Sequence, residues 1–165
     1  MKQVKILRGP SGSGKTTWTK KLADKLAKDG IGVTVVSADH FFESTETSMG
    51  DVGVHEHPVY NFDVTKLPEA HQYSLNAFLR ALLEEHPVIV VDNTNERRWE
   101  YMNYEMAAKL AGYEIEIVEF VCETIGDVRT CARRSAHRVP LAVTAKKAVF
   151  MEEDRRATRI PIEGV

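Results

Sequence analysis

The sequence predicts an α/β fold in which a parallel sheet of about four or five strands lies between two layers of helices. Short apolar runs that are typical of buried strands alternate with longer amphipathic patterns that are typical of helices. The glycine-rich segment 9–16 stands between the first strand pattern and the first helix pattern. Because no repeat, low-complexity tract or linker divides the chain, we expect one domain that spans residues 1–165.

The first third of the chain begins with a strand predicted at residues 2–8. Apolar residues at helical spacing then predict a helix over 15–28, and Gly30 ends it. A second strand is predicted at 33–37. The segment 38–63 lacks a clean period and is long for a loop, so we expect it to be functional or to contain short helices.

The rest of the chain continues the alternation, with helices predicted at 65–85, 97–111, 124–135 and 140–154 and strands at 88–91 and 113–121. In the first of these helices, the residues predicted to face the core are Leu75, Phe78, Leu79, Leu82 and Leu83. In the second, they are Trp99, Met102, Met106 and Leu110. His71 lies on the apolar side of its helix, and we expect it to be half-buried. The pattern indicates no element after residue 154.

The composition is that of an ordinary globular protein, with 43% hydrophobic and 28% charged residues. The formal net charge is −2, so a nucleic-acid partner has to bind to a local basic patch. Two cysteines, Cys122 and Cys131, are too few for a disulfide framework, and we expect reduced packing residues. No apolar run has membrane-spanning length and the N-terminus lacks a signal-peptide pattern, so we expect a cytoplasmic protein without a membrane partner.

The segment 9–16 matches the phosphate-binding loop pattern G-x-x-x-x-G-K-[ST] in full. Its glycines allow successive backbone N–H groups to point into one concavity, and the following helix adds the positive end of its dipole. Lys15 can reach the outer phosphates of a nucleotide, and the Thr16 hydroxyl can ligate Mg²⁺. The pattern therefore predicts a site for ATP and Mg²⁺, formed by Ser11, Gly12, Ser13, Gly14, Lys15, Thr16 and Thr17.

Two carboxylates follow predicted strands, at the edge where open α/β sheets bind ligands. Asp92 ends the buried run 88–91, where we expect a group on the magnesium side of the site; the alternative is a turn or a helix cap. Asp39 follows the second strand, where it can accept the proton of an attacking hydroxyl; the alternative is the N-cap of a short helix. Asn95 is either a polar group at the rim of the site or a cap of the next helix.

Arginines gather at the end of the helix predicted at 124–135. Their guanidinium groups can neutralise the charge of a phosphoryl group in transfer, so we expect a lid over about 124–140. Arg129 and Arg133 are four residues apart and share one helix face, where we expect them to contact the nucleotide, with Arg134 at the transferring phosphoryl group. The alternative is a solvated basic helix face.

Several segments together carry a family resemblance: residues 9–17, 37–39, 60–63, 67–71, 91–95, 97–99 and 134–140. At these segments the chain resembles the kinase domain of polynucleotide kinase, the small stand-alone relatives of that domain, and the P-loop domain of Nedd-binding proteins. The resemblance implies a three-layer, adenylate-kinase-like P-loop NTPase fold. It also implies transfer of the γ-phosphate of ATP to a hydroxyl group, most favourably the 5′-hydroxyl end of a DNA or an RNA.

By position, the resemblance gives Lys15 and Thr16 to ATP and magnesium, Asp39 the role of general base, and Asp92 a contact with magnesium-bound water or substrate. It makes the region around Arg134 the lid.

Four positions depart from the family pattern. His40 replaces a frequent second Asp, and Phe42 replaces an arginine that helps to bind substrate phosphate in phage enzymes. Arg138 replaces a common Gly before Val-Pro, and Ser11 replaces a frequent Pro. The alternatives are therefore a kinase for a small molecule, a modified base or an aminoacyl-tRNA, and a nucleotide-dependent switch without phosphoryl transfer. The sequence does not indicate the oligomeric state.

Overall fold

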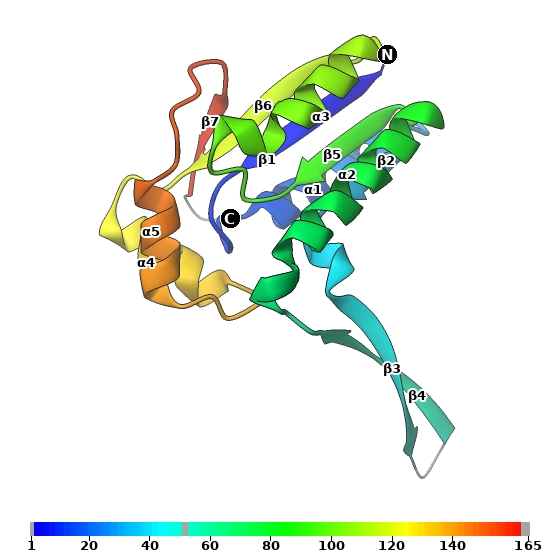
Figure 1. The fold of residues 1–165 in the computed structure, drawn as a ribbon, viewed down its shortest axis with the longest axis vertical. Helices are drawn as coiled ribbons and strands as arrows, with labels where there is room; N and C mark the ends of the chain where they lie inside the picture. Colours follow the sequence, from blue (N-terminus) through cyan, green and yellow to red (C-terminus); the bar gives the residue numbers. More distant parts are fainter. Residues whose placement is uncertain (1, 51–52, 163–165) are drawn as a thin grey trace.

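The computed structural model describes residues 2–50 and 53–162, and for residues 45–50 and 53–58 we describe the backbone alone. Within these residues the central sheet has five strands in the order β2-β5-β1-β6-β7 (Figure 1). Their bounds are β1 Gln3–Arg8, β2 Val33–Val36, β5 Val88–Asp92, β6 Glu114–Val121 and β7 Thr158–Pro161. All neighbouring pairs are parallel, so the carboxyl ends of the strands meet at one edge.

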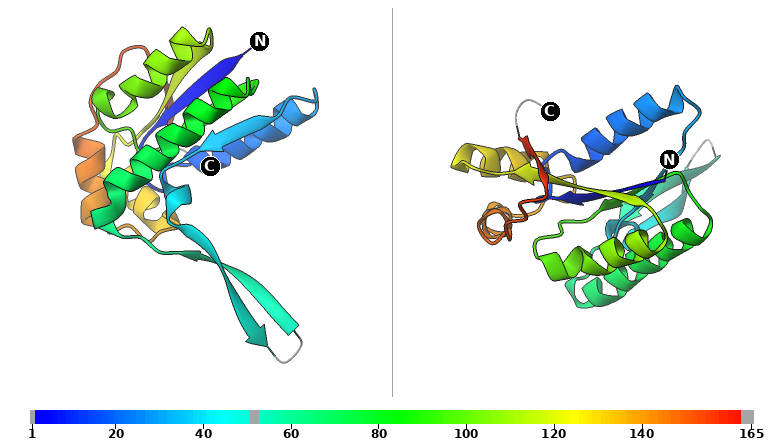
Figure 2. Two further views of the ribbon diagram at one scale, coloured as in Figure 1. Left: turned by 45° about the vertical axis from the view of Figure 1, so that its right-hand side comes forward. Right: turned by 90° about the horizontal axis from the view of Figure 1, so that it is seen from above.

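Helices cover both faces of this sheet, as Figure 2 shows from above. Helix α1 (Lys15–Ala27) lies on one face, and helices α2 (Leu67–Leu83) and α3 (Arg98–Leu110) lie on the other. Helices α4 (Ile125–Arg134) and α5 (Leu141–Val149) lie beyond the carboxyl end of the sheet (Figure 1). The expected α/β architecture, with a parallel sheet between two helical layers, is confirmed.

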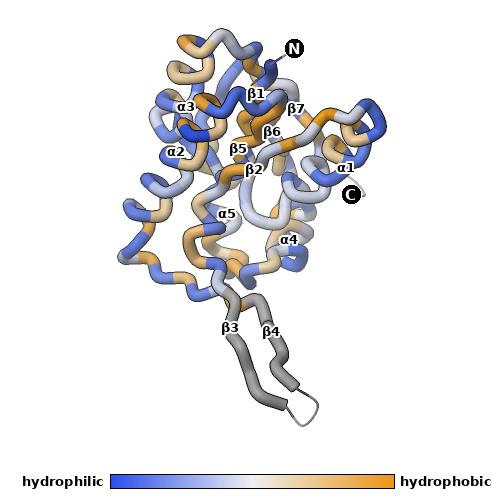
Figure 3. Tube along the Cα trace, turned by 90° about the vertical axis from the view of Figure 1, so that its right-hand side faces the viewer, coloured by the Kyte–Doolittle hydropathy of each residue, from blue (hydrophilic) through white to orange (hydrophobic). Residues whose placement is uncertain are grey.

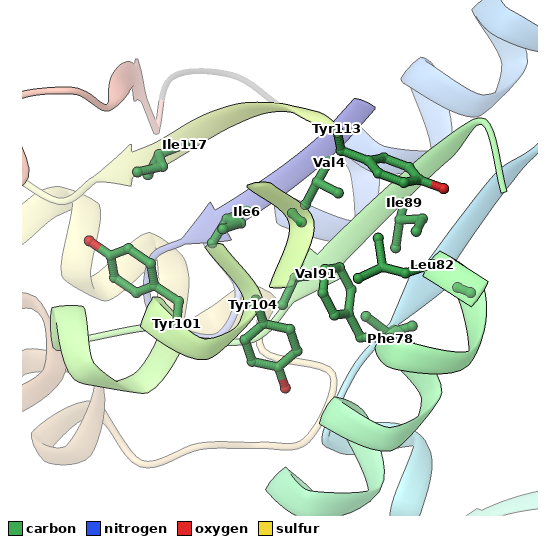
Figure 4. Packing of buried hydrophobic residues seen from close by; sticks show 13 residues of the cluster. Val4, Ile6, Phe78, Leu82, Ile89, Val91, Tyr101, Tyr104, Tyr113 and Ile117 are labelled. Carbon is green, nitrogen blue, oxygen red and sulfur yellow. The ribbon is translucent and has the colours of Figure 1, made fainter. Parts of the chain in front are cut away.

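The core forms on both faces of the inner strands, because helices cover each face. The apolar interior of the sheet is visible in Figure 3. Val4 and Ile6 pack toward α2 and α3, whereas Leu7 packs toward α1. Phe78 of α2 meets Tyr104 of α3 edge to face, with ring centroids 5.1 Å apart (Figure 4).

The buried faces of α2 and α3 differ from those expected from the apolar spacing. On α3 the buried residues are Tyr101, Tyr104 and Ala108. The four residues expected to be buried there are instead 50–87% exposed: Trp99, Met102, Met106 and Leu110. On α2, Phe78 and Leu82 are buried and Leu75 is partly buried, but Leu79 and Leu83 are 39% and 85% exposed. The expectation fails because these helices carry apolar side chains on two faces, and contact with the sheet selects one of them.

His71 is exposed, so the expected half-buried histidine is wrong. The side chain belongs to the solvent side of α2, whose neighbouring buried residues are Ala70 and Ser74. No helix within the described residues is long and apolar enough to cross a membrane.

The segment 38–63 folds mainly as a hairpin, which the sequence did not predict. After the short 3₁₀ helix η1 (Asp39–Phe41), strands β3 (Glu43–Gly50) and β4 (Gly53–Tyr60) pair antiparallel. Figure 1 shows that this hairpin extends away from the sheet. A second 3₁₀ helix, η2 (Val64–Lys66), leads into α2.

Candidate functional site

The candidate site lies at the carboxyl edge of the sheet, where three neighbouring strands end. The glycine-rich loop follows β1, Asp92 ends β5, and Asp39 follows β2. Because β1, β5 and β2 are consecutive in the sheet, these segments lie side by side. Two hydrogen bonds join the ends of β2 and β5: the Ser37 hydroxyl donates to the Asp92 carbonyl at 2.8 Å, and the Ala38 N–H donates to Asn93 Oδ1 at 2.8 Å.

The backbone of the loop has the conformation that a phosphate cradle requires. Gly9, Gly12 and Gly14 have φ values of 142°, 76° and 99°, which residues other than glycine rarely adopt. A Cβ on Gly12 would collide with the carbonyl oxygen of Cys131 in α4. The Ser13 hydroxyl is buried and lacks a hydrogen-bond partner within the described residues. A buried unpaired donor and left-handed glycines fit a loop that closes around an anion.

Lys15, Thr16 and Asp92 converge next to the loop. The Lys15 ammonium donates to the carbonyl oxygens of Gly9 at 2.9 Å and Pro10 at 3.1 Å. The Thr16 hydroxyl donates to Asp92 Oδ2 at 3.2 Å. Burial lowers the pKa of Lys15 and raises the pKa of Asp92, while the attraction between the two charges opposes both shifts. The hydroxyl and carboxylate oxygens are of the type that Mg²⁺ prefers, so these residues fit that ion.

The Asp39 side chain is 50% exposed and is contacted on each carboxylate oxygen. The Tyr60 hydroxyl, from the end of β4, donates to Oδ1 at 2.8 Å. His137 Nε2, from the segment between α4 and α5, lies 3.8 Å from Oδ2. Chemically, a half-exposed carboxylate beside a phosphate cradle can accept a proton from a bound hydroxyl.

An aromatic group lies around Asp39, formed by Phe41, Phe42, Tyr60, Phe62 and Tyr73. Phe42 is buried at its centre, with 4% of its surface exposed, whereas Phe62 and Tyr73 are 55% and 47% exposed. Tyr60 and Phe62 stack, with an interplanar angle of 9°. Two members of this aromatic group, Phe62 and Tyr73, are therefore open to a ligand.

Arg8 stabilises the start of the loop, and the sequence analysis assigned it no role. It is fully buried and pairs with Glu119, its register partner on β6, at 2.5 Å. Its guanidinium also donates to the carbonyl oxygens of Asn95 at 3.1 Å and Glu96 at 3.3 Å. The sequence holds a signal for this pair, because each residue is a charge within an apolar strand pattern.

Asn95 has neither of the positions expected from the sequence. Its side chain is 2% exposed and donates to the Leu7 carbonyl at 2.7 Å. Arg97 occupies the N-cap position of α3, and the Arg98 N–H donates to the Glu152 carboxylate at 2.9 Å, not to Asn95. Asn95 therefore fixes the loop after β5 against β1.

The segment between α4 and α5 contacts the site through two residues other than arginine. Ser135 Oγ lies 2.9 Å from Ser11 Oγ, and His137 approaches Asp39. The four arginine side chains are exposed, and within the described residues none forms a hydrogen bond or ion pair with loop 9–16: Arg129, Arg133, Arg134 and Arg138. A contact between them and a nucleotide therefore stays a prediction.

Cys122 and Cys131 have free thiols, with their sulfurs 3.4 Å apart. Cys131 is fully buried and Cys122 is partly buried. Cys131 is therefore a packing residue, as expected, and the reduced state of both thiols stays a prediction.

The family of the chain follows from comparison with known sequences. A family model described as an AAA domain matches residues 4–160. The chain belongs to this AAA-domain family. Human NEDD4-binding protein 2 is 28% identical over 157 residues, which cover 95% of this chain and 8% of that protein. The chain therefore spans less than a tenth of the length of this relative.

Solved structures with the same fold include kinases. An APS kinase from Mycobacterium tuberculosis, in complex with AMPPNP and APS, has a TM-score of 0.58 and 16% identity, and the match covers 99% of this chain and 90% of that one. A chain of a Pnkp1/Rnl/Hen1 RNA repair complex has a TM-score of 0.62 and 16% identity. The match covers 91% of this chain and 44% of that one. At such identity the likeness establishes the fold, which is that of the P-loop kinases.

Proposed function

We propose that this domain is an ATP-dependent kinase that transfers the γ-phosphate to a hydroxyl group of a nucleic acid, most favourably the 5′-hydroxyl of a polynucleotide. The observation that carries the proposal is the placement of Asp39. Asp39 follows β2, the strand next to the one that Asp92 ends, and its half-exposed carboxylate lies within electrostatic reach of Lys15. A domain that only binds nucleotide needs the phosphate cradle but no proton acceptor beside it.

The nucleotide phosphates would be held by the backbone and side chains of residues 11–17, with Lys15 as the point charge. Thr16 and Asp92 would hold Mg²⁺, which when bound neutralises charge on the phosphate oxygens. The Ser13 hydroxyl is buried and has no hydrogen-bond partner within the described residues. It can therefore donate to an anion that binds in the loop. In this proposal Thr16 exchanges its hydrogen bond with Asp92 for a contact with the ion.

The transfer step moves one proton and one phosphoryl group. Asp39 takes the proton of the acceptor hydroxyl, while the oxygen of that hydroxyl forms a bond to the γ-phosphorus. The bond from that phosphorus to the bridging oxygen breaks, and the electron pair leaves with ADP. Lys15 and Arg134 would stabilise the charge on the transferring oxygens, with Arg129 and Arg133 on the nucleotide. Residues 124–140 would form the lid that brings these arginines inward within one domain over residues 1–165.

The aromatic group supports an acceptor with a planar ring. The exposed ring of Phe62 stacks on Tyr60, whose hydroxyl donates to Asp39, and aromatic side chains of this kind stack on nucleobases. A nucleic-acid end or a nucleoside meets this requirement. A chain of the Pnkp1/Rnl/Hen1 RNA repair complex shares the fold, which supports the nucleic-acid end.

A second candidate is a kinase for a small molecule or a modified base. It is favoured by Phe42, which is buried within the aromatic group and therefore offers no cation for a substrate phosphate.

The third candidate, a nucleotide-dependent switch, predicts that Asp39→Ala leaves every activity unchanged. The compartment we propose is the cytosol, because two cysteines are too few for the disulfide framework typical of secreted domains.

The test is a panel of hydroxyl acceptors incubated with γ-labelled ATP and Mg²⁺. The panel contains DNA and RNA oligonucleotides with 5′-hydroxyl ends, nucleosides, DNA with hydroxymethylated pyrimidines, and aminoacyl-tRNA. We expect label on the 5′ ends. Label on a small molecule or modified base alone supports the second candidate, and no transfer to any acceptor refutes the kinase proposal.

A further inference from the structure

Two residues from separate parts of the chain approach the Asp39 carboxylate. Asp39 belongs to η1, Tyr60 ends β4, and His137 lies between α4 and α5. The Tyr60 hydroxyl lies 2.8 Å from Oδ1, and His137 Nε2 lies 3.8 Å from Oδ2. The His137 ring also stacks on the Tyr60 ring, with centroids 3.7 Å apart and planes 21° apart. Neither Tyr60 nor His137 has a part in the proposed function so far.

The two oxygens of Asp39 are held differently. Burial and the hydrogen bond to the carboxylate raise the pKa of Tyr60, so its hydroxyl stays a donor at neutral pH. It therefore fixes Oδ1. The distance from Oδ2 to His137 exceeds that of a hydrogen bond, and half of the Asp39 side chain is exposed. Oδ2 is thus the oxygen that can receive a proton from an acceptor.

The segment that carries His137 also contacts the phosphate loop. Ser135 Oγ lies 2.9 Å from Ser11 Oγ and accepts a hydrogen bond from the Val139 N–H at 3.2 Å. A further hydrogen bond, from the Arg138 N–H to the Ser135 carbonyl at 3.1 Å, closes a turn that presents His137. One short turn therefore contacts the phosphate loop at one end and the Asp39–Tyr60 pair at the other.

We propose that Tyr60 is the positioning residue of Asp39 and that His137, stacked on Tyr60, latches the lid onto this carboxylate. The inference rests on the proposed kinase function. Tyr60 turns Oδ2 toward the acceptor, and the latch places the lid over the site where the acceptor hydroxyl meets the γ-phosphate. Binding of the acceptor and closure of the lid are thereby coupled at one side chain.

The positioning role is tested with Tyr60→Phe, which removes the hydroxyl and keeps the stacked ring. The matched control is Tyr113→Phe, because the Tyr113 hydroxyl also donates one hydrogen bond, to the His86 carbonyl at 3.0 Å, at the opposite end of the sheet. For Tyr60→Phe we expect kcat to fall by about tenfold, with KM for ATP unchanged, because the orientation of the base is lost. Equal kcat values in Tyr60→Phe and the wild type would overturn the positioning role.

The latch is tested without nucleotide or acceptor, by limited trypsin cleavage at Arg134 and Arg138. His137→Gln and Tyr60→Leu remove the stack, and we expect cleavage there to become about threefold faster or more. Tyr60→Phe keeps the stack and should be cleaved at the wild-type rate. Melting temperatures of all variants exclude general unfolding as the cause. Unchanged cleavage in His137→Gln and Tyr60→Leu would overturn the latch.

The two proposals fail in different ways. If the wild-type protein transfers label to no acceptor, the proposed function fails, whatever the protease finds. If the wild type transfers label and Tyr60→Phe does so equally well, the kinase function stands and this inference is refuted.

Discussion

The buried pair of Arg8 and Glu119 should contribute much more to stability than its surface counterpart on the same two strands. Arg8 is fully buried and Glu119 is 7% exposed. Lys5 and Glu116 form the corresponding pair three residues earlier, also in register, but the Glu116 side chain is 41% exposed. We therefore compare Glu119→Gln with Glu116→Gln, which make the same chemical change in two environments.

The expected cost follows from what each change leaves behind. Glu119→Gln removes the negative charge from a guanidinium that has no access to water, and losing one partner of a buried pair costs about 3–5 kcal/mol. Three backbone carbonyls, those of Asn95, Glu96 and Glu152, still accept from Arg8, so we take the lower end, about 3 kcal/mol. A half-exposed pair such as Lys5 with Glu116 contributes about 0–1 kcal/mol.

The measurement is thermal and urea unfolding, followed by circular dichroism. For a chain of this size, about 3 kcal/mol corresponds to a fall in Tm of about 6–12 °C. The Glu116→Gln control should change Tm by about 3 °C or less. If the two variants unfold at the same temperature, the buried pair does not hold the start of the phosphate loop as we argue.

Three further predictions concern the loop and the segment after α5. Lys15→Ala should lower turnover by about two to three orders of magnitude, measured by label transfer, because it removes the charge that stabilises the transferring oxygens; unchanged turnover would refute that role. Gly12→Ala should abolish nucleotide binding in a calorimetric titration while the chain stays folded, since the added Cβ collides with the backbone of α4; wild-type affinity would contradict the geometry. The hydrogen bond from Arg156, and then that from Tyr101, lower the pKa of Asp154 against the effect of burial. The contribution of this carboxylate is therefore complete above about pH 4 and is lost as the pH falls, so the Tm difference between Asp154→Asn and the wild type should shrink from pH 6 to pH 2. A constant difference would show that the charge of Asp154 does not stabilise the fold.

The sequence was sufficient for four of the five strands of the sheet and for the glycine-rich loop, because these depend on local pattern. The run 88–91 is apolar throughout, as expected for a parallel strand buried on both faces, and it forms the centre of β5. The hairpin β3–β4 escaped prediction because its residues lack an apolar alternation, and its strands are joined by backbone pairing. Strand β7 escaped because residues 158–161 pair with β6 through long-range packing that no local period reports.

The sequence also predicted which residues gather at the carboxyl edge, since strand order places Asp39 and Asp92 beside the loop. It did not predict a role for Arg8 or His137, and although it marked residues 60–63 as a possible substrate contact, it did not predict the hydrogen bond from Tyr60 to Asp39. Their positions depend on contacts between elements far apart in the chain, such as Tyr60 with His137, and no spacing rule connects such residues.

The most direct test of the central claim is single-turnover transfer from γ-labelled ATP by Asp39→Asn, with the affinity for ATP measured in parallel. The account predicts that transfer slows by about 10²–10⁴-fold, because the proton acceptor is lost, while ATP binds as in the wild type. Transfer at the wild-type rate would contradict the account, and so would a collapse of ATP affinity, which would assign Asp39 to the nucleotide instead of the acceptor.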